Sequence, residues 1–177
     1  MNITVYGAAS EKIKDAYKTA AFGLGREMAK RGHTLIFGGG KNGLMGATAR
    51  GAKSENGNII GIAPRFFKPD GVFYEECTEF ICTDDMRSRK ALLEGKADAI
   101  IVLPGGIGTY DEFFEVFTLK TLGQINKPIA VYNVLGYFDH LYGLLSHAAE
   151  ELFMDKKVLD GLMFSSSAEE ILDFFEK

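Results

Sequence analysis

Short apolar runs alternate with longer amphipathic segments along almost the whole chain, and this alternation limits the fold more than any other feature. The apolar runs, which we expect to be strands, are residues 3–6, 34–37, 58–62, 79–82, 98–103 and 128–132. Repeated strand–helix alternation predicts a parallel sheet with helices on both faces. The run at 98–103 is continuously apolar after its first residue, as in a central strand buried on both faces. We therefore predict an α/β fold, Rossmann-like and doubly wound, that forms a single domain over residues 1–177.

The amphipathic segments predict the helices of this fold. In the first of them, which Ser10 can cap, apolar residues recur at helical spacing at Ile13, Tyr17, Ala20, Leu24 and Met28. Further helices are expected over residues 44–55, 86–96, 110–122, 137–151 and 168–176. Residues 64–76 contain two of the four prolines and are expected to form a loop. Because doubly wound sheets bind ligands at the carboxyl ends of their strands, the loops of interest are 7–10, 38–43, 83–89 and 104–109.

The composition argues against several classes of partner. With 46% hydrophobic residues, the chain of 177 residues can bury a core, which excludes a disordered protein. Twenty basic residues against 24 acidic ones give a net charge of −4, so we expect no binding to nucleic acid or to membrane surfaces. No apolar stretch approaches the ~20 residues needed to cross a bilayer. Residues 1–5 do not begin a signal peptide, and we expect a cytoplasmic protein.

The cysteines and histidines do not indicate a metal site. Cys77 and Cys82 are the only two thiols, too few for a disulfide framework or a zinc knuckle. Cys82 ends the apolar run 80–82 and is expected to be a small core residue. His140 and His147 lie seven residues apart on one expected helix, where a surface or subunit contact is favoured over metal binding. No metal ion is expected.

A glycine-rich turn between the buried strand and the next helix is the strongest indication of a binding site. It contains Gly105, Gly106, Gly108 and Thr109. These glycines let the backbone turn tightly, and a helix N-terminus adds four unpaired N–H donors and a partial positive charge, which predicts a phosphate site. Gly106 and Gly108 are therefore expected to tolerate no side chain, because it would block the anion or forbid the required backbone angles. The alternative is a tight turn in which Thr109 and Glu112 form a T-x-x-E capping box.

A second glycine-rich turn, Gly38 to Gly46, also links a strand to a helix. It is not G-x-G-x-x-G, and no acidic residue ends the strand at 59–62 to bind a ribose hydroxyl, so an NAD site is disfavoured. Gly39 and Gly40 could instead let the base or ribose of a nucleotide approach the backbone. Sharp turning and close helix–strand packing explain these glycines equally well.

A basic helix start follows the fourth strand. Met86, Arg89 and Leu93 fall on one helical face, so Arg89 shares a face with apolar residues, whereas Arg87 lies on another. An arginine on an inward face at the carboxyl edge of a sheet indicates a ligand contact or a buried ion pair. The alternative, a solvated basic turn, fits Arg87 and Lys90 better than Arg89.

Together and in this order, the three motifs resemble the LONELY GUY (LOG) family of cytokinin-nucleotide phosphoribohydrolases. The family pattern P-G-G-x-G-T-x-x-E is matched in full by residues 104–112, its arginine–lysine pair by Arg89 and Lys90, and its G-G-G-x-x-G-L-M-G loop by residues 38–46. The resemblance covers roughly residues 3–150. Where the family commonly has C-G-S-S this chain has Gly-Ala-Ala-Ser ending at Ser10, and where it commonly has Met-His this chain has Met86-Arg87. Both loops are expected to face the nucleotide.

The resemblance implies hydrolysis of the N-glycosidic bond of cytokinin or adenosine nucleoside 5′-monophosphates, which yields a free base and ribose 5-phosphate. It places the Glu112 carboxylate beside the ribose, where it stabilises an oxocarbenium-like transition state, while Arg89 binds the substrate or assists the leaving base. This reaction needs no metal or organic cofactor. The label "possible lysine decarboxylase", which the family often carries, finds no support, because lysine decarboxylation needs pyridoxal phosphate and nothing in the sequence marks its Schiff-base lysine. The remaining residues expected to bind phosphate or nucleotide are Gly105, Gly106, Gly108, Thr109, Lys90, Met86, Gly39, Gly40 and Ser10.

Two functions other than catalysis are also compatible with the sequence. One is a carrier of the same fold, similar to molybdenum cofactor carriers, which share a glycine-rich phosphate loop; the complete T-x-x-E ending and Arg89 favour the hydrolase. The other is a sensor that binds a nucleotide without turnover. The resemblance to the LOG family implies a homodimer. The phenylalanines at 113, 114 and 117 agree with this prediction, because they make their helix more apolar than a helix with one buried face requires. The preferred base is left open.

Overall fold

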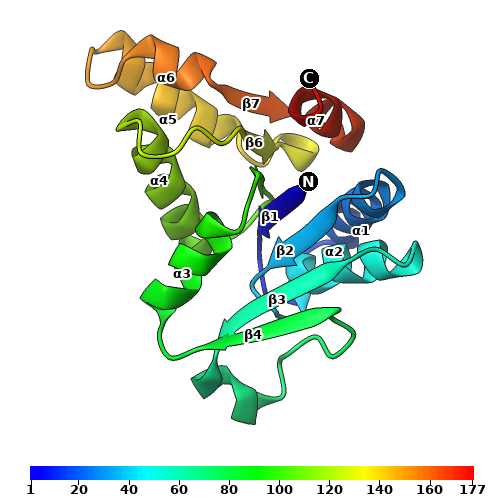
Figure 1. Ribbon diagram of the computed structural model, residues 1–177. Coiled ribbons are helices and arrows are strands. Elements are labelled where there is room, and N and C mark those ends of the chain that lie inside the picture. The colour runs from blue at the N-terminus through cyan, green and yellow to red at the C-terminus, as the bar shows by residue number, and fades with distance from the viewer.

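The computed structural model describes residues 1–177, the side chains of residues 69 and 70 excepted, and its strands form one parallel sheet (Figure 1). In space the seven strands lie in the order β4-β3-β2-β1-β5-β6-β7. The predicted doubly wound α/β fold is therefore confirmed. The strands are β1 (Asn2–Tyr6), β2 (Thr34–Phe37), β3 (Ile59–Pro64), β4 (Glu79–Thr83), β5 (Ala99–Val102), β6 (Ile129–Tyr132) and β7 (Leu162–Ser165).

Helices cover both faces of this sheet. Those on one face are α1 (Asp15–Lys30), α2 (Gly43–Ser54) and α7 (Ala168–Phe175), and those on the other are α3 (Met86–Gly95), α4 (Ile107–Thr121), α5 (Asp139–Glu150) and α6 (Lys156–Asp160). Two short 3₁₀ segments, η1 (Arg65–Asp70) and η2 (Val134–Gly136), follow β3 and β6. Among the helices described, none combines the length and the apolar character needed to cross a membrane.

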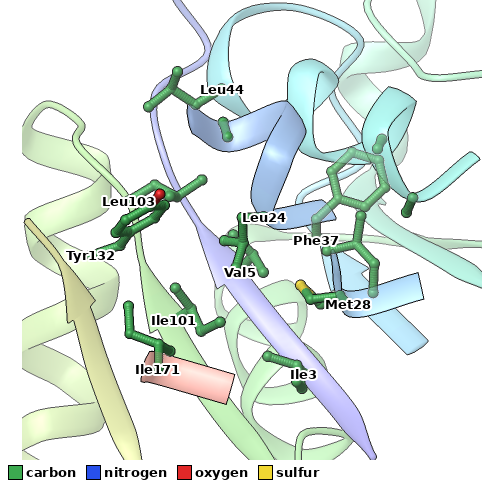
Figure 2. Close-up of a cluster of buried hydrophobic side chains, with 14 of the residues drawn as sticks. Ile3, Val5, Leu24, Met28, Phe37, Leu44, Ile101, Leu103, Tyr132 and Ile171 are labelled. Atoms are coloured by element: carbon green, nitrogen blue, oxygen red, sulfur yellow. The ribbon is translucent and has the colours of Figure 1, made fainter. Parts of the chain in front are cut away.

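The core consists of two apolar layers separated by the sheet. On the face of α1, side chains of Val5 and Ile101 from the central strands meet Leu24 of α1 and Ile171 of α7, as Figure 2 shows. On the other face, Ile100 and Val102 pack with residues of α3 and α4. Since β5 supplies fully buried side chains to both layers, its continuous apolar run is explained as predicted.

The connection from β4 to β5 creates the crevice in which this class of sheet binds ligands. The chain first adds β2, β3 and β4 on one side of β1, and then crosses to place β5 on the other side. The loops after β1 and β5 consequently leave the sheet in opposite directions and open a space between them. Both loops belong to the set selected from the sequence.

Several local expectations are wrong. Helix α1 begins at Asp15 with Lys14 as its N-cap, so Ser10 does not cap it and lies in the preceding loop. Cys82 is exposed and not a core residue, because β4 is an edge strand. The expected loop at 64–76 contains η1, and strand β7 and helix α6 were not expected at all.

Candidate active site

A cavity of about 650 Å³ opens at the carboxyl edge of the sheet, beside the crevice between β1 and β5. Residues from the predicted loops at 7–10, 38–43 and 104–109 all line it, which confirms that the two glycine-rich turns lie side by side. The first turns of α3 and α4 and the segment around η1 complete the wall. The residues that line it include Ala8, Ser10, Gly38, Gly40, Met45, Phe67, Val72, Phe73, Met86, Arg89, Gly106, Gly108, Thr109, Asp111 and Glu112.

An ion pair between Arg89 and Glu112 lies in the wall of this cavity. Nη1 of Arg89 donates to Oε1 of Glu112 at 2.7 Å, and both residues are only 8% exposed. Nε of Arg89 also donates to the carbonyl oxygen of Ile62 at 3.2 Å, which fixes the guanidinium. Burial raises the pKa of Glu112, while the positive charge of Arg89 opposes that rise. The pair thus places a fixed Glu112 carboxyl group beside a fixed Arg89 guanidinium, and both residues line the cavity.

The capping interpretation of Glu112 is wrong. Helix α4 begins at Ile107, three residues earlier than predicted, with Gly106 as its N-cap and no side chain capping it. Thr109 and Glu112 both lie inside the helix, and the Glu112 carboxylate binds Arg89 instead of a backbone N–H. The sequence spacing T-x-x-E is therefore not a capping box here.

The uncapped start of α4 leaves backbone donors without partners at the cavity, which Gly106, Gly108 and Thr109 line. In the part of the chain that the structure describes, the N–H groups of residues 106–109 donate to no protein acceptor. A Cβ added at Gly106 or Gly108 would meet open space, and neither glycine has a positive φ. The absence of a side chain at these positions keeps space open, and it is not required by the backbone angles. Free N–H groups at a helix N-terminus favour an anion such as phosphate.

Comparison with known proteins identifies the family. A model of the family described as "Possible lysine decarboxylase" matches residues 45–175. The cytokinin riboside 5′-monophosphate phosphoribohydrolases LOG3 and LOG1 of Arabidopsis thaliana are 34% and 35% identical to the chain. These matches cover 99% and 98% of this chain and 81% and 82% of the relatives. The chain belongs to the LOG family. The names of these relatives place the LOG-family chain among hydrolases of N-glycosyl bonds and not among lysine decarboxylases.

Solved structures with the same fold include molybdenum cofactor proteins. The molybdenum cofactor binding protein from Rippkaea orientalis superposes with a TM-score of 0.74 at 26% identity, over 99% of the LOG-family chain and 94% of its own. The molybdenum cofactor carrier protein from Chlamydomonas reinhardtii gives 0.76 at 18% identity, over 99% and 95%. At 18% identity the latter likeness shows the fold alone.

The glycine-rich turn after β2 makes room for the arginine of the LOG-family pair. A Cβ at Gly38 would overlap the guanidinium of Arg89, so a glycine there lets Arg89 reach Glu112. Gly40 lines the cavity as predicted, beside Met45. Gly39 does not line it. Its φ of +73° and the close ring of Phe80 make it a turning and packing residue.

Two other predicted contacts lie outside the cavity. Lys90 points to the outer side of α4, where Nζ pairs with Asp111 at 3.1 Å and with Glu115 at 2.6 Å. Gly105 is buried behind the turn, and a Cβ there would overlap the side chain of Thr109. Lys90 binds carboxylates of α4 and Gly105 packs against Thr109, but neither Lys90 nor Gly105 lines the cavity. The exposed Arg87 also does not line the cavity, as its helical face predicted.

An apolar part of the wall was missed from the sequence. Phe67, Val72 and Phe73 come from the segment expected to be a featureless loop, and they face the cavity together with Met86. An isolated bridge between Gly40 and Phe73 ties this segment to the second glycine turn. The signal available was three aromatic residues within 66–73, which is unusual for a solvated loop. Across the side chains that are described, no group of three or more His, Cys, Asp or Glu residues could hold a metal ion.

Proposed function

We propose that this chain hydrolyses the N-glycosidic bond of nucleoside 5′-monophosphates and releases a free base and ribose 5-phosphate. The observation that carries the proposal is the buried Arg89–Glu112 pair, which lies in a cavity wall within two turns of an uncapped helix start. The free N–H groups of residues 106–109 offer a place for the 5′-phosphate. Glu112 lies about 4.5 Å further along the helix than Thr109, on the side where the ribose would follow the phosphate.

The chemistry needs a negative charge near the sugar. As the bond from C1′ to the base nitrogen breaks, the ribosyl group gains oxocarbenium character, which the Glu112 carboxylate stabilises. The oxygen of a water molecule then bonds to C1′. The water loses one proton in this step, and the leaving base gains one, so the protons balance. Arg89 opposes the rise that burial causes in the pKa of Glu112, holds the carboxylate in place, and lines the cavity, where it can bind the substrate or assist the leaving base.

The apolar wall supports a nucleotide with a large flat base. Phe67, Val72 and Phe73 offer a surface on which a purine can pack, and Met45 and Met86 add flexible apolar contacts. The relatives are named for cytokinin riboside 5′-monophosphates, so adenine carrying an apolar N6 group is the substrate class we propose. We also propose that the enzyme works in the cytoplasm, as a homodimer and without a cofactor.

Base release from a panel of nucleotides tests the proposal. Purified protein is incubated with AMP, N6-prenyl AMP, GMP and CMP, and free base and ribose 5-phosphate are quantified by chromatography. We expect equal amounts of the two products, with the N6-prenyl nucleotide cleaved fastest. Absence of base release from every nucleotide would contradict the hydrolase.

A carrier of the same fold is the second candidate. It is favoured by one observation, the TM-score of 0.74 with a molybdenum cofactor binding protein at 26% identity. A carrier would bind its phosphorylated ligand tightly and release no product over hours. The buried carboxylate favours the hydrolase, because an anionic cargo gains nothing from a second negative charge beside it.

A further inference from the structure

A tyrosine from a neighbouring loop is hydrogen-bonded to the turn that precedes α4. The hydroxyl of Tyr137, which follows η2, donates to the carbonyl oxygen of Gly105 at 2.7 Å. None of the three sequence motifs includes this residue. The contact joins the loop after β6 to the loop after β5, two loops at the same edge of the sheet.

The direction of the Gly105 carbonyl fixes the direction of the next N–H. The chain contains no cis peptide bond, and in a trans peptide the C=O of one residue and the N–H of the next point in opposite directions. Because the Gly105 carbonyl points to Tyr137, the N–H of Gly106 points away from it. Gly106 lines the cavity and its N–H has no protein acceptor in the described part of the chain.

The preceding peptide is held from another side. The carbonyl oxygen of Pro104 accepts a hydrogen bond from the N–H of Ala8 at 3.1 Å. Two consecutive carbonyls of the turn are therefore occupied, that of Pro104 by the backbone of Ala8 and that of Gly105 by Tyr137. Of the two, only the Tyr137 contact depends on a side chain.

The loop that carries Tyr137 has little freedom to move. Asn133 uses both ends of its amide, since Nδ2 donates to Asp139 at 2.7 Å and Oδ1 accepts from the N–H of Phe138 at 2.7 Å. Gly136 has a φ of +70°, and a Cβ there would lie 2.6 Å from the Asp139 carboxylate. The ring of Tyr137 also packs edge-on against Tyr17, with centroids 5.9 Å apart. The hydroxyl is thus delivered to Gly105 by a loop that is already ordered.

We propose that Tyr137 is a positioning residue of the anion site, which aims the N–H of Gly106 into the cavity through the carbonyl of Gly105. The proposal rests on the proposed function only for the identity of the anion as a nucleotide 5′-phosphate. Tyr137 touches no ligand in this role. In the described part of the chain, its hydroxyl is the group that holds the carbonyl of the peptide between Gly105 and Gly106.

The test removes the hydroxyl and keeps the ring. Dissociation constants are measured by calorimetry for ribose 5-phosphate, ribose and adenosine, with wild type, Tyr137→Phe and Tyr142→Phe. Tyr142, in the first turn of α5, is a matched control, since its ring packs on Phe164 of β7 and it does not line the cavity. We expect Tyr137→Phe to weaken binding of ribose 5-phosphate about 5- to 10-fold, the scale of one hydrogen bond, and to change the affinity for ribose and adenosine less than 2-fold.

Kinetics give a second readout that a general loss of stability would not produce. With AMP as substrate, KM should rise by about the same factor, while kcat stays within 2-fold of wild type. Equal weakening of phosphorylated and unphosphorylated ligands would overturn the proposal, and so would unchanged affinity for ribose 5-phosphate. If the wild-type protein binds ribose 5-phosphate but cleaves no nucleotide, the proposed function fails, and the binding comparison still decides the role of Tyr137.

Discussion

At the scale of single residues, the charge of Glu112 separates the hydrolase from a binding protein. Glu112→Gln keeps the size of the side chain and can still accept a hydrogen bond from Arg89. It removes the negative charge that meets the developing ribosyl cation, so we expect base release from AMP to fall by roughly 100-fold or more. Ribose 5-phosphate should still bind, which shows that the variant is folded. Near-normal turnover would end the mechanism proposed above.

Arg89 and Arg87 form a matched pair two residues apart on α3. Arg89→Ala should abolish most base release, whereas Arg87→Ala, on the exposed face, should keep most of it. Because Arg89→Ala leaves Glu112 buried without its partner, unfolding in urea should show a loss of about 3–5 kcal/mol. Adding Glu112→Gln to Arg89→Ala should restore part of that stability and none of the activity. A double variant no more stable than Arg89→Ala would count against a buried ion pair.

Gly108 tests the space reserved for the anion. Gly108→Val should prevent binding of ribose 5-phosphate with the fold retained, because its side chain enters open space in the cavity and its φ is not positive. Gly143→Val is the control, since Gly143 is also a helical glycine with nothing within 4 Å of an added Cβ, but lies on α5. Calorimetry with ribose 5-phosphate measures the difference. Unchanged affinity in a folded Gly108→Val protein would refute the anion site.

At the scale of elements, α1 and α2 pack so closely that glycine is required where they cross. A Cβ at Gly51 would overlap the carbonyl of Phe22, whereas a Cβ at Gly23 would meet nothing. We expect Gly51→Ala to lower the free energy of unfolding by about 1–3 kcal/mol, the range for overpacking. Gly23→Ala should raise it by about 0.5–1 kcal/mol, because alanine restricts the unfolded chain and favours helix. Urea midpoints compare the two; similar midpoints would show that the helices can separate at little cost.

The elements that are predicted correctly are those whose structure follows from the pattern of apolar residues within the segment itself. Six strands and the helices between them follow from apolar periodicity, and Arg89 was placed on an inward face by spacing alone. The start of α4 was misplaced because the glycines of the turn hide a helix that begins at Ile107 without a side-chain cap. The exposure of Cys82 was not predicted, because nothing in a three-residue apolar run shows that its strand will lie at the edge of the sheet.

The parts of the site that sequence did not predict depend on distant contacts. Lys90 follows Arg89 directly, yet it turns outward because Asp111 and Glu115 on α4 offer it two carboxylates. Phe67 and Phe73 face the cavity because their segment is pinned to the turn after β2. Tyr137 reaches Gly105 only when β6 lies beside β5. Local pattern contains none of these relationships.

At the scale of the whole molecule, α4 still presents apolar side chains to the surface. Phe113 and Phe117 are buried in the core, so only Phe114 of the three phenylalanines remains partly exposed, with Leu122 at the end of the helix. The predicted homodimer would cover them. Light scattering at micromolar concentration should give twice the monomer mass, and Phe114→Asp should give the monomer. Leu144→Asp, on α5, is the control and should leave the dimer intact; a monomeric wild type would contradict the prediction.

The central position of β1 has a consequence for synthesis of the chain. Ile3 of β1 lies opposite Leu35 of β2 on one side and opposite Ala99 of β5 on the other. One edge of β1, the first strand to be synthesised, therefore has no partner until β5 has been synthesised. At roughly 5–20 residues per second, the ~60 residues between β2 and β5 take about 3–12 s to emerge from the ribosome. During this interval an apolar strand edge has no partner, which is the state most open to pairing with another nascent chain. Synonymous codons that slow translation between residues 37 and 99 should therefore lower the yield of soluble protein more than equally slow codons after residue 132.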